Sequence, residues 1–265
     1  MLISHECPIS MLEDSRVFND YDYALVHLFE TNPEYYEFFK HSLYIGRNVI
    51  LDNSIFELGE SFDADRFAFW IDKLQPTDYI IPDALENSLQ TQLNAIEWKK
   101  RYSNLPGNKI GVVQGKTYQE LVDCYRCLDK QINVDKIAIS FDYSYYLEVS
   151  KHPNKWMGYT IGRVQTLTRL LSDGYINTKK PHHLLGCSLP IEFMFYGEGF
   201  EWISSLDTSN PIVHGILNKR YADYGLDSKE SIKLVNLINN VPLSFQREVI
   251  DYNIMKFRSI VNKNV

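Results

Sequence analysis

The chain has 265 residues, of which 45% are apolar, 14% aromatic and 23% charged. This length fits one large domain with a substantial core, and the charged fraction is ordinary for a globular protein, so gross disorder is not expected. The net charge of -7 argues against generic nucleic-acid binding, but residues 1–97 hold 5 Lys or Arg against 18 Asp or Glu, and residues 98–265 hold 22 against 16. This asymmetry predicts either one basic face from the C-terminal two-thirds or mixed solvated surfaces.

No apolar run has the length of a membrane span, and the N-terminus carries Glu6, Glu13 and Asp14 instead of a basic segment. We therefore expect neither a membrane partner nor a signal peptide. The four cysteines are too few for a disulfide scaffold of this length, which favours a reducing cytoplasm.

Short apolar runs alternate with amphipathic stretches along the chain, and the alternation predicts an α/β protein. Residues 1–20 show no clear hydrophobic periodicity. Residues 143–155 are interpreted as an elaborated aromatic loop, and the C-terminal tail, from residue 228, is interpreted as helical. In chain order, we expect a strand at 23–29, a helix at 34–42, a strand at 49–52, a helix at 62–74, a strand at 79–83, a helix at 89–102, a strand at 110–114, a helix at 118–131, a strand at 135–142, a helix at 162–171, strands at 183–186 and 203–207, the start of an eighth strand at 212–215, and helices at 228–238 and 243–261.

About eight strand–helix repeats predict a (β/α)₈ TIM barrel in which residues 1–265 form a single domain with C-terminal helices. Five of the apolar runs end in polar side chains that would meet at the carboxyl face of the barrel: Asp52, Asp83, Gln114, Asp142 and Asp207. Each aspartate alone could simply cap the following helix. Together they suggest a site, because a pair of carboxylates suits displacement at a sugar anomeric carbon.

Four of these segments resemble motifs of the tRNA-guanine transglycosylases. Leu-Asp-Asn-Ser-Ile-Phe-Glu at residues 51–57 is similar to that family's Asp-Ser-Gly-Gly-Phe/Tyr-Gln, and Val-Val-Gln-Gly at 112–115 to its Val-Gln-Gly. His-Leu-Leu-Gly at 183–186 is similar to its Tyr-Leu-Met-Gly, and Ser-Leu-Asp-Thr-Ser-Asn-Pro at 205–211 to its nucleophile-bearing strand end. The four matches occur in family order.

The resemblance implies an enzyme that exchanges guanine for a 7-deazaguanine base. It assigns Asp207 as the nucleophile at C1′ and Asp52, with a raised pKa, as the general acid/base. Phe56 would stack on the base, and Asp83 would bind its Watson–Crick edge. The resemblance further places substrate contacts at Asn53, Gln114, Gly115, Ser140, Gly186 and His183.

The chain also departs from that family. Its Cys-x-Cys-x-x-Cys zinc motif after the nucleophile is absent, since no cysteine follows Cys187, so neither a metal nor another cofactor is expected. Ser54-Ile55 replaces the Gly-Gly of the first motif, and no RNA-binding domain is appended. A short zinc-free chain looks most like the phage-encoded DNA 7-deazaguanine transglycosylases. This likeness implies modification of DNA, with tRNA as the alternative, and a location in the cytoplasm of the host cell.

Two other functions remain open: a hydrolase of the N-glycosidic bond, and a non-catalytic nucleic-acid-binding barrel. Tyr143, Tyr145 and Tyr146 could grip a displaced strand or pack over the barrel rim. Cys124 and Cys127 have metal-ligand spacing but lie within an expected helix, so we interpret them as core cysteines.

Overall fold

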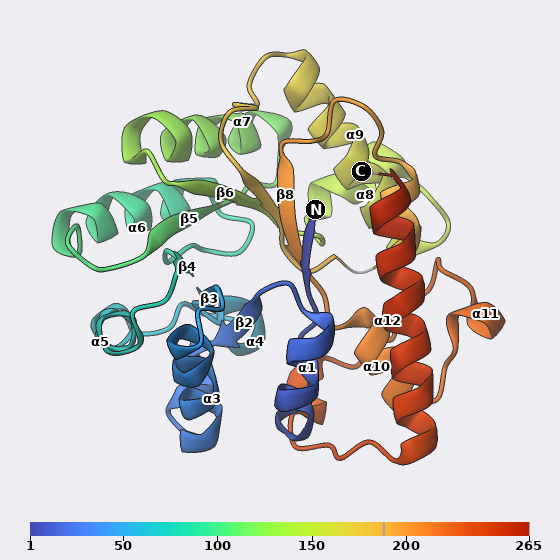
Figure 1. The fold of residues 1–265 in the computed structure, drawn as a ribbon. Helices are drawn as coiled ribbons and strands as arrows, with labels where there is room; N and C mark the ends of the chain where they lie inside the picture. The colour runs from blue at the N-terminus through green and yellow to red at the C-terminus, as the bar shows by residue number, and fades with distance from the viewer. Residues whose placement is uncertain (188, 265) are drawn as a thin grey trace.

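The computed structural model describes residues 1–187 and 189–264. Eight parallel strands curve into a nearly closed barrel with helices around its outside (Figure 1). The predicted TIM-like α/β fold is therefore confirmed. The strand order is β1-β8-β7-β6-β5-β4-β3-β2, so the N-terminal strand lies beside the last one. The strands are β1 Leu2–Ser4, β2 Asp22–Leu25, β3 Val49–Asp52, β4 Asp78–Ile80, β5 Asn108–Val113, β6 Lys136–Ile139, β7 His182–Leu184 and β8 Ile203–Asp207.

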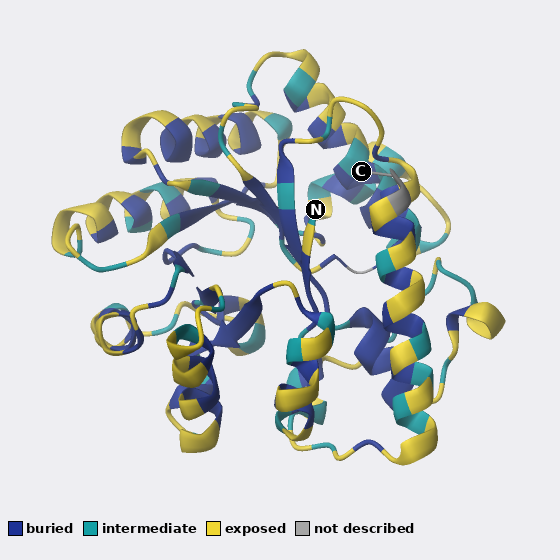
Figure 2. Cartoon of the chain, in the orientation of Figure 1, coloured by how far each residue is buried: buried dark blue, intermediate teal, exposed yellow. Residues whose placement is uncertain are grey.

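The strands are short apolar runs because parallel strands in a barrel are covered on both faces. Val49, Ile50 and Leu51 of β3, for example, are all at most 2% exposed. Figure 2 shows the strands largely buried, whereas most of the surrounding helices bury one face and expose the other.

Helix starts follow from local capping. The Asp63 side chain accepts a hydrogen bond from the backbone N–H of Arg66, and Thr117 and Glu120 form a capping box. The helices are α1 Leu12–Phe18, α2 Val26–Phe29, α3 Pro33–Tyr44, α4 Ile55–Leu58, α5 Ala64–Leu74, α6 Ser88–Arg101, α7 Tyr118–Arg126 with a π-helical continuation Cys127–Ile132, α8 Ser144–Ser150, α9 Lys155–Ser172, α10 Asn210–Ile216, α11 Tyr221–Tyr224 and α12 Ser244–Asn264, with 3₁₀ turns at Ile9–Met11, Pro190–Met194 and Leu234–Leu237.

Two expectations about the barrel strands were wrong. The eighth strand is β1, not residues 212–215, which belong to α10. All seven residues of α10 are buried, and a short apolar run that is buried on every side does not reveal its period. Strand β1 escaped detection because it is only three residues long.

Four further segments differ from expectation. The predicted strand at 23–29 is divided into β2 and the helical turn α2, and the expected loop at 143–155 contains α8. Helix α9 starts at Lys155, well before residue 162, and its Gly162 allows close packing on α8: a Cβ atom there would lie 2.3 Å from the Tyr146 carbonyl oxygen. Residues 228–238 form only a 3₁₀ turn, Leu234–Leu237, because this segment crosses the barrel mouth and contributes side chains to a cavity.

Strands β1 and β2 lie at the two ends of the strand order, and no ladder between them is found in the described residues. Other contacts hold this seam together. The Asp20 N–H donates to the Ile3 carbonyl oxygen at 3.0 Å, and the Tyr21 hydroxyl donates to the Leu206 carbonyl oxygen at 2.5 Å. The barrel is thus completed by turn and side-chain contacts at this one position.

Candidate active site

A cavity of about 270 Å³ opens at the carboxyl ends of the strands. Barrel enzymes have their active sites at this end, and the volume is close to that of small-molecule sites in general. The strand-end side chains that the sequence predicts to meet do line this one cavity: Asp52, Asp83, Gln114, Asp142 and Asp207.

Asp207 ends β8, and two donors hold its buried carboxylate. His183 Nε2 lies 2.9 Å from Oδ1, and the Gly186 backbone N–H lies 3.2 Å from each carboxylate oxygen. Burial lowers the pKa of His183, so the ring is neutral near pH 7. Since an ionised carboxylate only accepts, Nε2 carries the proton, and Nδ1 accepts from the Ser205 hydroxyl at 2.9 Å. These contacts fix the direction of the carboxylate.

Asp52 ends β3 and faces the same cavity. The Tyr23 hydroxyl donates to Oδ2 at 2.6 Å, and the Ser54 N–H donates to Oδ1 at 2.5 Å. Burial, followed by the charge of Glu57 and, more weakly, that of Asp207, raises the pKa of Asp52 well above its ordinary value, against the effect of both hydrogen bonds. The raised pKa expected for a general acid/base is therefore present. Asp52 and Asp207 thus differ: the former favours its protonated form, and the latter is held by two donors.

The turn after Asp52 explains how Ser54-Ile55 can stand where the resembling motif has Gly-Gly. Ser54 has φ of 60°, in the left-handed region that glycine adopts easily. The side chains around it stabilise this conformation: Asp52 accepts from the Ser54 N–H, and Asn53 Oδ1 accepts from the Ile55 N–H at 3.0 Å. A serine is tolerated here because its two predecessors bind the backbone of the turn.

Asp83 lies deeper and is bound by two amides. Asn53 Nδ2 donates to Oδ1 at 2.8 Å, and Gln114 Nε2 donates to Oδ2 at 2.7 Å. The Gln114 amide is oriented in turn by the Glu86 N–H, which donates to its Oε1 at 2.8 Å. Burial raises the pKa of Asp83, and both amide hydrogen bonds oppose this effect. Each carboxylate oxygen keeps further lone-pair capacity, so the group can still accept hydrogen bonds from a ligand.

Phe56 lies at the mouth of the cavity and is 40% exposed. Lys233 also lines the cavity and contacts Phe56. The Lys233 ammonium donates to the Phe56 carbonyl oxygen at 2.9 Å and lies 4.2 Å from the centroid of its ring. The ring is thus a surface at the entrance on which a planar group could stack.

The remaining predicted residues divide into two groups. Asn53, Ser140 and Gly186 line the cavity. His183 is fully buried, and its ring stacks on Tyr23 with 6.2 Å between centroids and 13° between planes; it contacts Asp207 and is not among the lining residues. Gly115 is not among the lining residues. It packs on the first turn of α7, where a Cβ atom would lie 2.8 Å from Glu120 Cβ.

The lining residues that the sequence reasoning missed include Glu6, Tyr23, Glu57 and Lys229. Glu6 follows β1, and the run Leu-Ile-Ser before it was too short to be recognised as a strand. Tyr23 lay inside an expected strand with nothing to mark its hydroxyl, and Glu57 was noted only as part of a motif. Burial raises the pKa of Glu57 to about 7, so it is a further acid that titrates near neutrality.

Lysines and aromatic rings form one wall of the cavity. The Lys229 ammonium lies 5.1 Å from the Trp156 ring centroid, and the Lys155 ammonium lies 5.4 Å from the same ring. Burial lowers the pKa of Lys229. The neighbouring Tyr143 and Tyr146 are both buried, as expected for a packed rim and not for a strand grip.

Cys124 and Cys127 are buried free thiols, so their interpretation as core cysteines is confirmed. In residues 1–187 and 189–264, no cluster of His, Cys, Asp or Glu is arranged to hold a metal ion. None of the helices in the same ranges has the length and apolar content of a membrane span.

No protein-family model matches the chain, and a search of curated proteins finds no match. The functional argument therefore depends on the geometry of the cavity and on the motif resemblance.

Proposed function

We propose that the chain is a base-exchange glycosyltransferase that replaces guanine in DNA with a 7-deazaguanine derivative through a covalent intermediate on Asp207. One observation carries the proposal. Asp207, whose carboxylate accepts from two donors, faces the same cavity as Asp52, whose pKa is raised. An oriented carboxylate nucleophile and a carboxylic acid that can give up a proton are what double displacement at a glycosidic carbon requires.

In the first half-reaction, an Asp207 carboxylate oxygen attacks C1′ as the bond from C1′ to N9 of guanine breaks. The Asp52 carboxylic acid gives its proton to the departing base, which leaves neutral guanine and a glycosyl ester. In the second half-reaction, the incoming base loses its N9 proton to the Asp52 carboxylate and attacks C1′. The ester bond breaks, and the Asp207 carboxylate is restored.

Base recognition is assigned to the Asp83 network. The N1–H and exocyclic amine of guanine and its 7-deaza analogues are donors, and the oriented Asp83 carboxylate is an acceptor. The Gln114 amide would add a polar contact along the same wall, and Phe56 would stack on the face of the base. This combination resembles the way flipped bases are bound between an aromatic ring and fixed polar groups.

The choice of DNA comes from the likeness to the short, zinc-free transglycosylases of phages, which places the reaction in the cytoplasm of the host cell. A base in a duplex must be extruded to enter a cavity of this kind, at a cost of a few kcal/mol. Lys155, Lys229 and Lys233 lie around the cavity, where a phosphate backbone would be bound.

An exchange assay with labelled guanine tests the proposal, with double-stranded DNA, single-stranded DNA and tRNA offered separately. Label entering DNA and not tRNA is the expected result. Entry into tRNA alone would keep the chemistry and overturn the choice of nucleic acid. Free guanine released without an added acceptor base would indicate a hydrolase, and absence of both products would contradict a catalytic role.

A further inference from the structure

Glu6 is an acidic residue of the cavity that the exchange mechanism above does not use. Strands β1 and β8 pair with Ser4 opposite Asp207, and the Thr208 N–H donates to the Ser4 carbonyl oxygen at 3.0 Å. Glu6 follows two residues later and lines the same cavity. Burial, the charge of Asp207 and a hydrogen bond to its carboxyl group are among the causes that raise the pKa of Glu6, and both side chains line this cavity.

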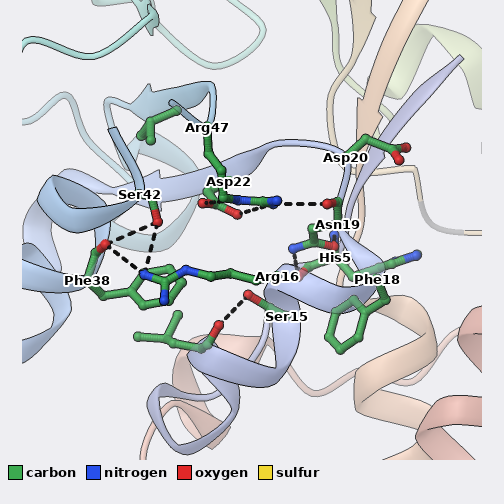
Figure 3. A network of polar contacts seen from close by, with 12 residues as sticks. His5, Ser15, Arg16, Phe18, Asn19, Asp20, Asp22, Phe38, Ser42 and Arg47 are labelled. Carbon is green, nitrogen blue, oxygen red and sulfur yellow. Dashed lines mark hydrogen bonds and ion pairs between the residues drawn. The ribbon is translucent and has the colours of Figure 1, made fainter. Parts of the chain in front are cut away.

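The backbone before Glu6 is fixed by a polar network at the seam between β1 and β2 (Figure 3). The Asn19 side chain binds His5 twice: Oδ1 accepts from the His5 N–H at 2.6 Å, and Nδ2 donates to the His5 carbonyl oxygen at 3.1 Å. Arg47 in turn donates to the Asn19 carbonyl oxygen at 2.9 Å and to Asp22 at 2.8 Å. Asn19 thus replaces the strand pairing that the seam lacks and sets the position from which Glu6 projects.

Two carboxyl groups can be hydrogen-bonded to each other only when one of them carries a proton. Asp207 already accepts from His183 and from the Gly186 N–H, so it is the acceptor of the pair. Burial and then the charge of Asp207 raise the pKa of Glu6 well above its ordinary value. The proton therefore belongs to Glu6. The other ionisable groups that act on or around this carboxyl are Asp52, Glu57, Tyr23, Tyr21, Tyr35, Cys7 and Lys229.

We propose that Glu6 is a positioning residue for the nucleophile: its protonated carboxyl donates to the Asp207 carboxylate and, with His183 and Gly186, fixes the direction from which that carboxylate attacks C1′. The inference rests on the proposed function, because it assigns a role within that reaction. It also makes the reaction sensitive to alkaline pH. When Glu6 loses its proton, a second negative charge faces Asp207, and the hydrogen bond is replaced by repulsion.

Two substitutions separate this role from simple packing. Glu6→Gln keeps an N–H donor but cannot titrate, whereas Glu6→Ala removes the donor. We expect Glu6→Gln to exchange base within about threefold of the wild-type rate, with weaker loss at alkaline pH. We expect Glu6→Ala to be slower by roughly 10- to 100-fold, the usual effect of losing a hydrogen bond to a charged group. Glu198→Gln, at an exposed acid, is the matched control.

The second measurement needs no substrate. The ¹³C-labelled glutamate carboxyls of the wild type are titrated by NMR, with Glu6→Gln used to assign the Glu6 signal. Glu6 should titrate above the ordinary carboxyl range and move toward that range in Asp207→Asn, where the neighbouring charge is absent.

A Glu6 signal that titrates in the ordinary range in the wild type would overturn the shared proton, whatever the enzyme does. Glu6→Ala exchanging at the wild-type rate, or Glu6→Gln as slow as Glu6→Ala, would overturn the positioning role. A lack of exchange by both the wild type and Glu198→Gln would instead contradict the proposed function, with the titration still deciding whether the two carboxyls share a proton.

Discussion

His183 and Asp207 are joined by a hydrogen bond of 2.9 Å between neighbouring strands. His183 pairs with Ser205 across β7 and β8, and its ring bonds to the hydroxyl of that residue and to the carboxylate two positions further along β8. Residues two apart on a strand share a face, so the ring spans Ser205 and Asp207 at once. The Asp207 carboxylate is therefore oriented from within the barrel interior.

His183→Ala should slow base exchange by roughly 10- to 100-fold, because Asp207 loses a donor that fixes its direction. Single-turnover exchange rates measure this effect, and circular dichroism checks the fold. Ser205→Ala is the milder comparison, since it leaves the Nε2 donor in place. An equal loss in both variants, or none in His183→Ala, would contradict the orienting role.

Asp83→Asn should weaken binding of the free base and leave the proton transfer at Asp52 intact. A neutral amide oxygen is a poorer acceptor than a carboxylate oxygen, and the NH₂ group of the new side chain would face the amide donor of either Asn53 or Gln114. We expect KM for the base to rise by roughly 10- to 100-fold, which is the usual effect of losing a hydrogen bond to a charged group. An unchanged KM with a lower kcat would place Asp83 in catalysis and not in recognition.

Glu57 should make the fold less stable as the pH rises from about 4.5 to about 7, the ordinary and folded-state values of its pKa. In this window the folded state holds a proton that the unfolded state has released, so the free energy of unfolding falls with rising pH. Below the window both states are protonated, and above it both are ionised. Urea denaturation of wild type and Glu57→Gln at several pH values should show a difference that grows across the window. A difference that is independent of pH would contradict the raised pKa.

The Arg163–Glu192 ion pair should be essential for stability. Arg163 Nε and Nη2 donate to the two Glu192 oxygens at 2.8 and 2.7 Å, and neither side chain is exposed. Arg163→Met should lower the free energy of unfolding by about 3–5 kcal/mol, because it leaves a buried carboxylate without its partner. Arg169→Met, at an exposed pair with Asp173, should change it by less than about 1 kcal/mol. Thermal or urea unfolding compares the two, and equal effects would contradict the prediction.

Arg163 of this ion pair also contacts the backbone beside the candidate active site. Arg163 Nη1 donates to the Leu185 carbonyl oxygen at 3.1 Å, next to the Gly186 N–H that binds Asp207. The fraction of Arg163→Met that remains folded should therefore also exchange base more slowly than the wild type.

The barrel and most of the cavity could be predicted from the sequence because β3, β4, β5, β6 and β8 are apolar runs that end in polar residues. The apolar run indicates the strand, and the polar residue that follows it indicates the end of the strand that faces the cavity. The prediction failed where a run was too short or was buried on all sides, as in β1 and α10. Missing β1 also concealed Glu6, since nothing else marks that glutamate as a cavity residue.

Contacts between strands that are distant in the chain could likewise not be predicted from the sequence. His183 was predicted to touch the base, but the pairing of β7 with β8 directs its ring at Asp207. Gly115 follows Gln114 directly, yet the chain has already turned toward α7 at that position. Which side of a strand end faces the cavity depends on register, and register is set by partners distant in the chain.

The covalent intermediate is the most direct test of the account. Wild type, Asp207→Asn and the control Glu198→Gln are mixed with a short DNA duplex, denatured and analysed by intact-protein mass spectrometry. The account predicts a DNA adduct on wild type and Glu198→Gln, localised to Asp207 by peptide mapping, and no adduct on Asp207→Asn. An adduct that persists in Asp207→Asn, or that maps to Asp52 or Glu6 in the wild type, would contradict the assignment of Asp207 as the nucleophile.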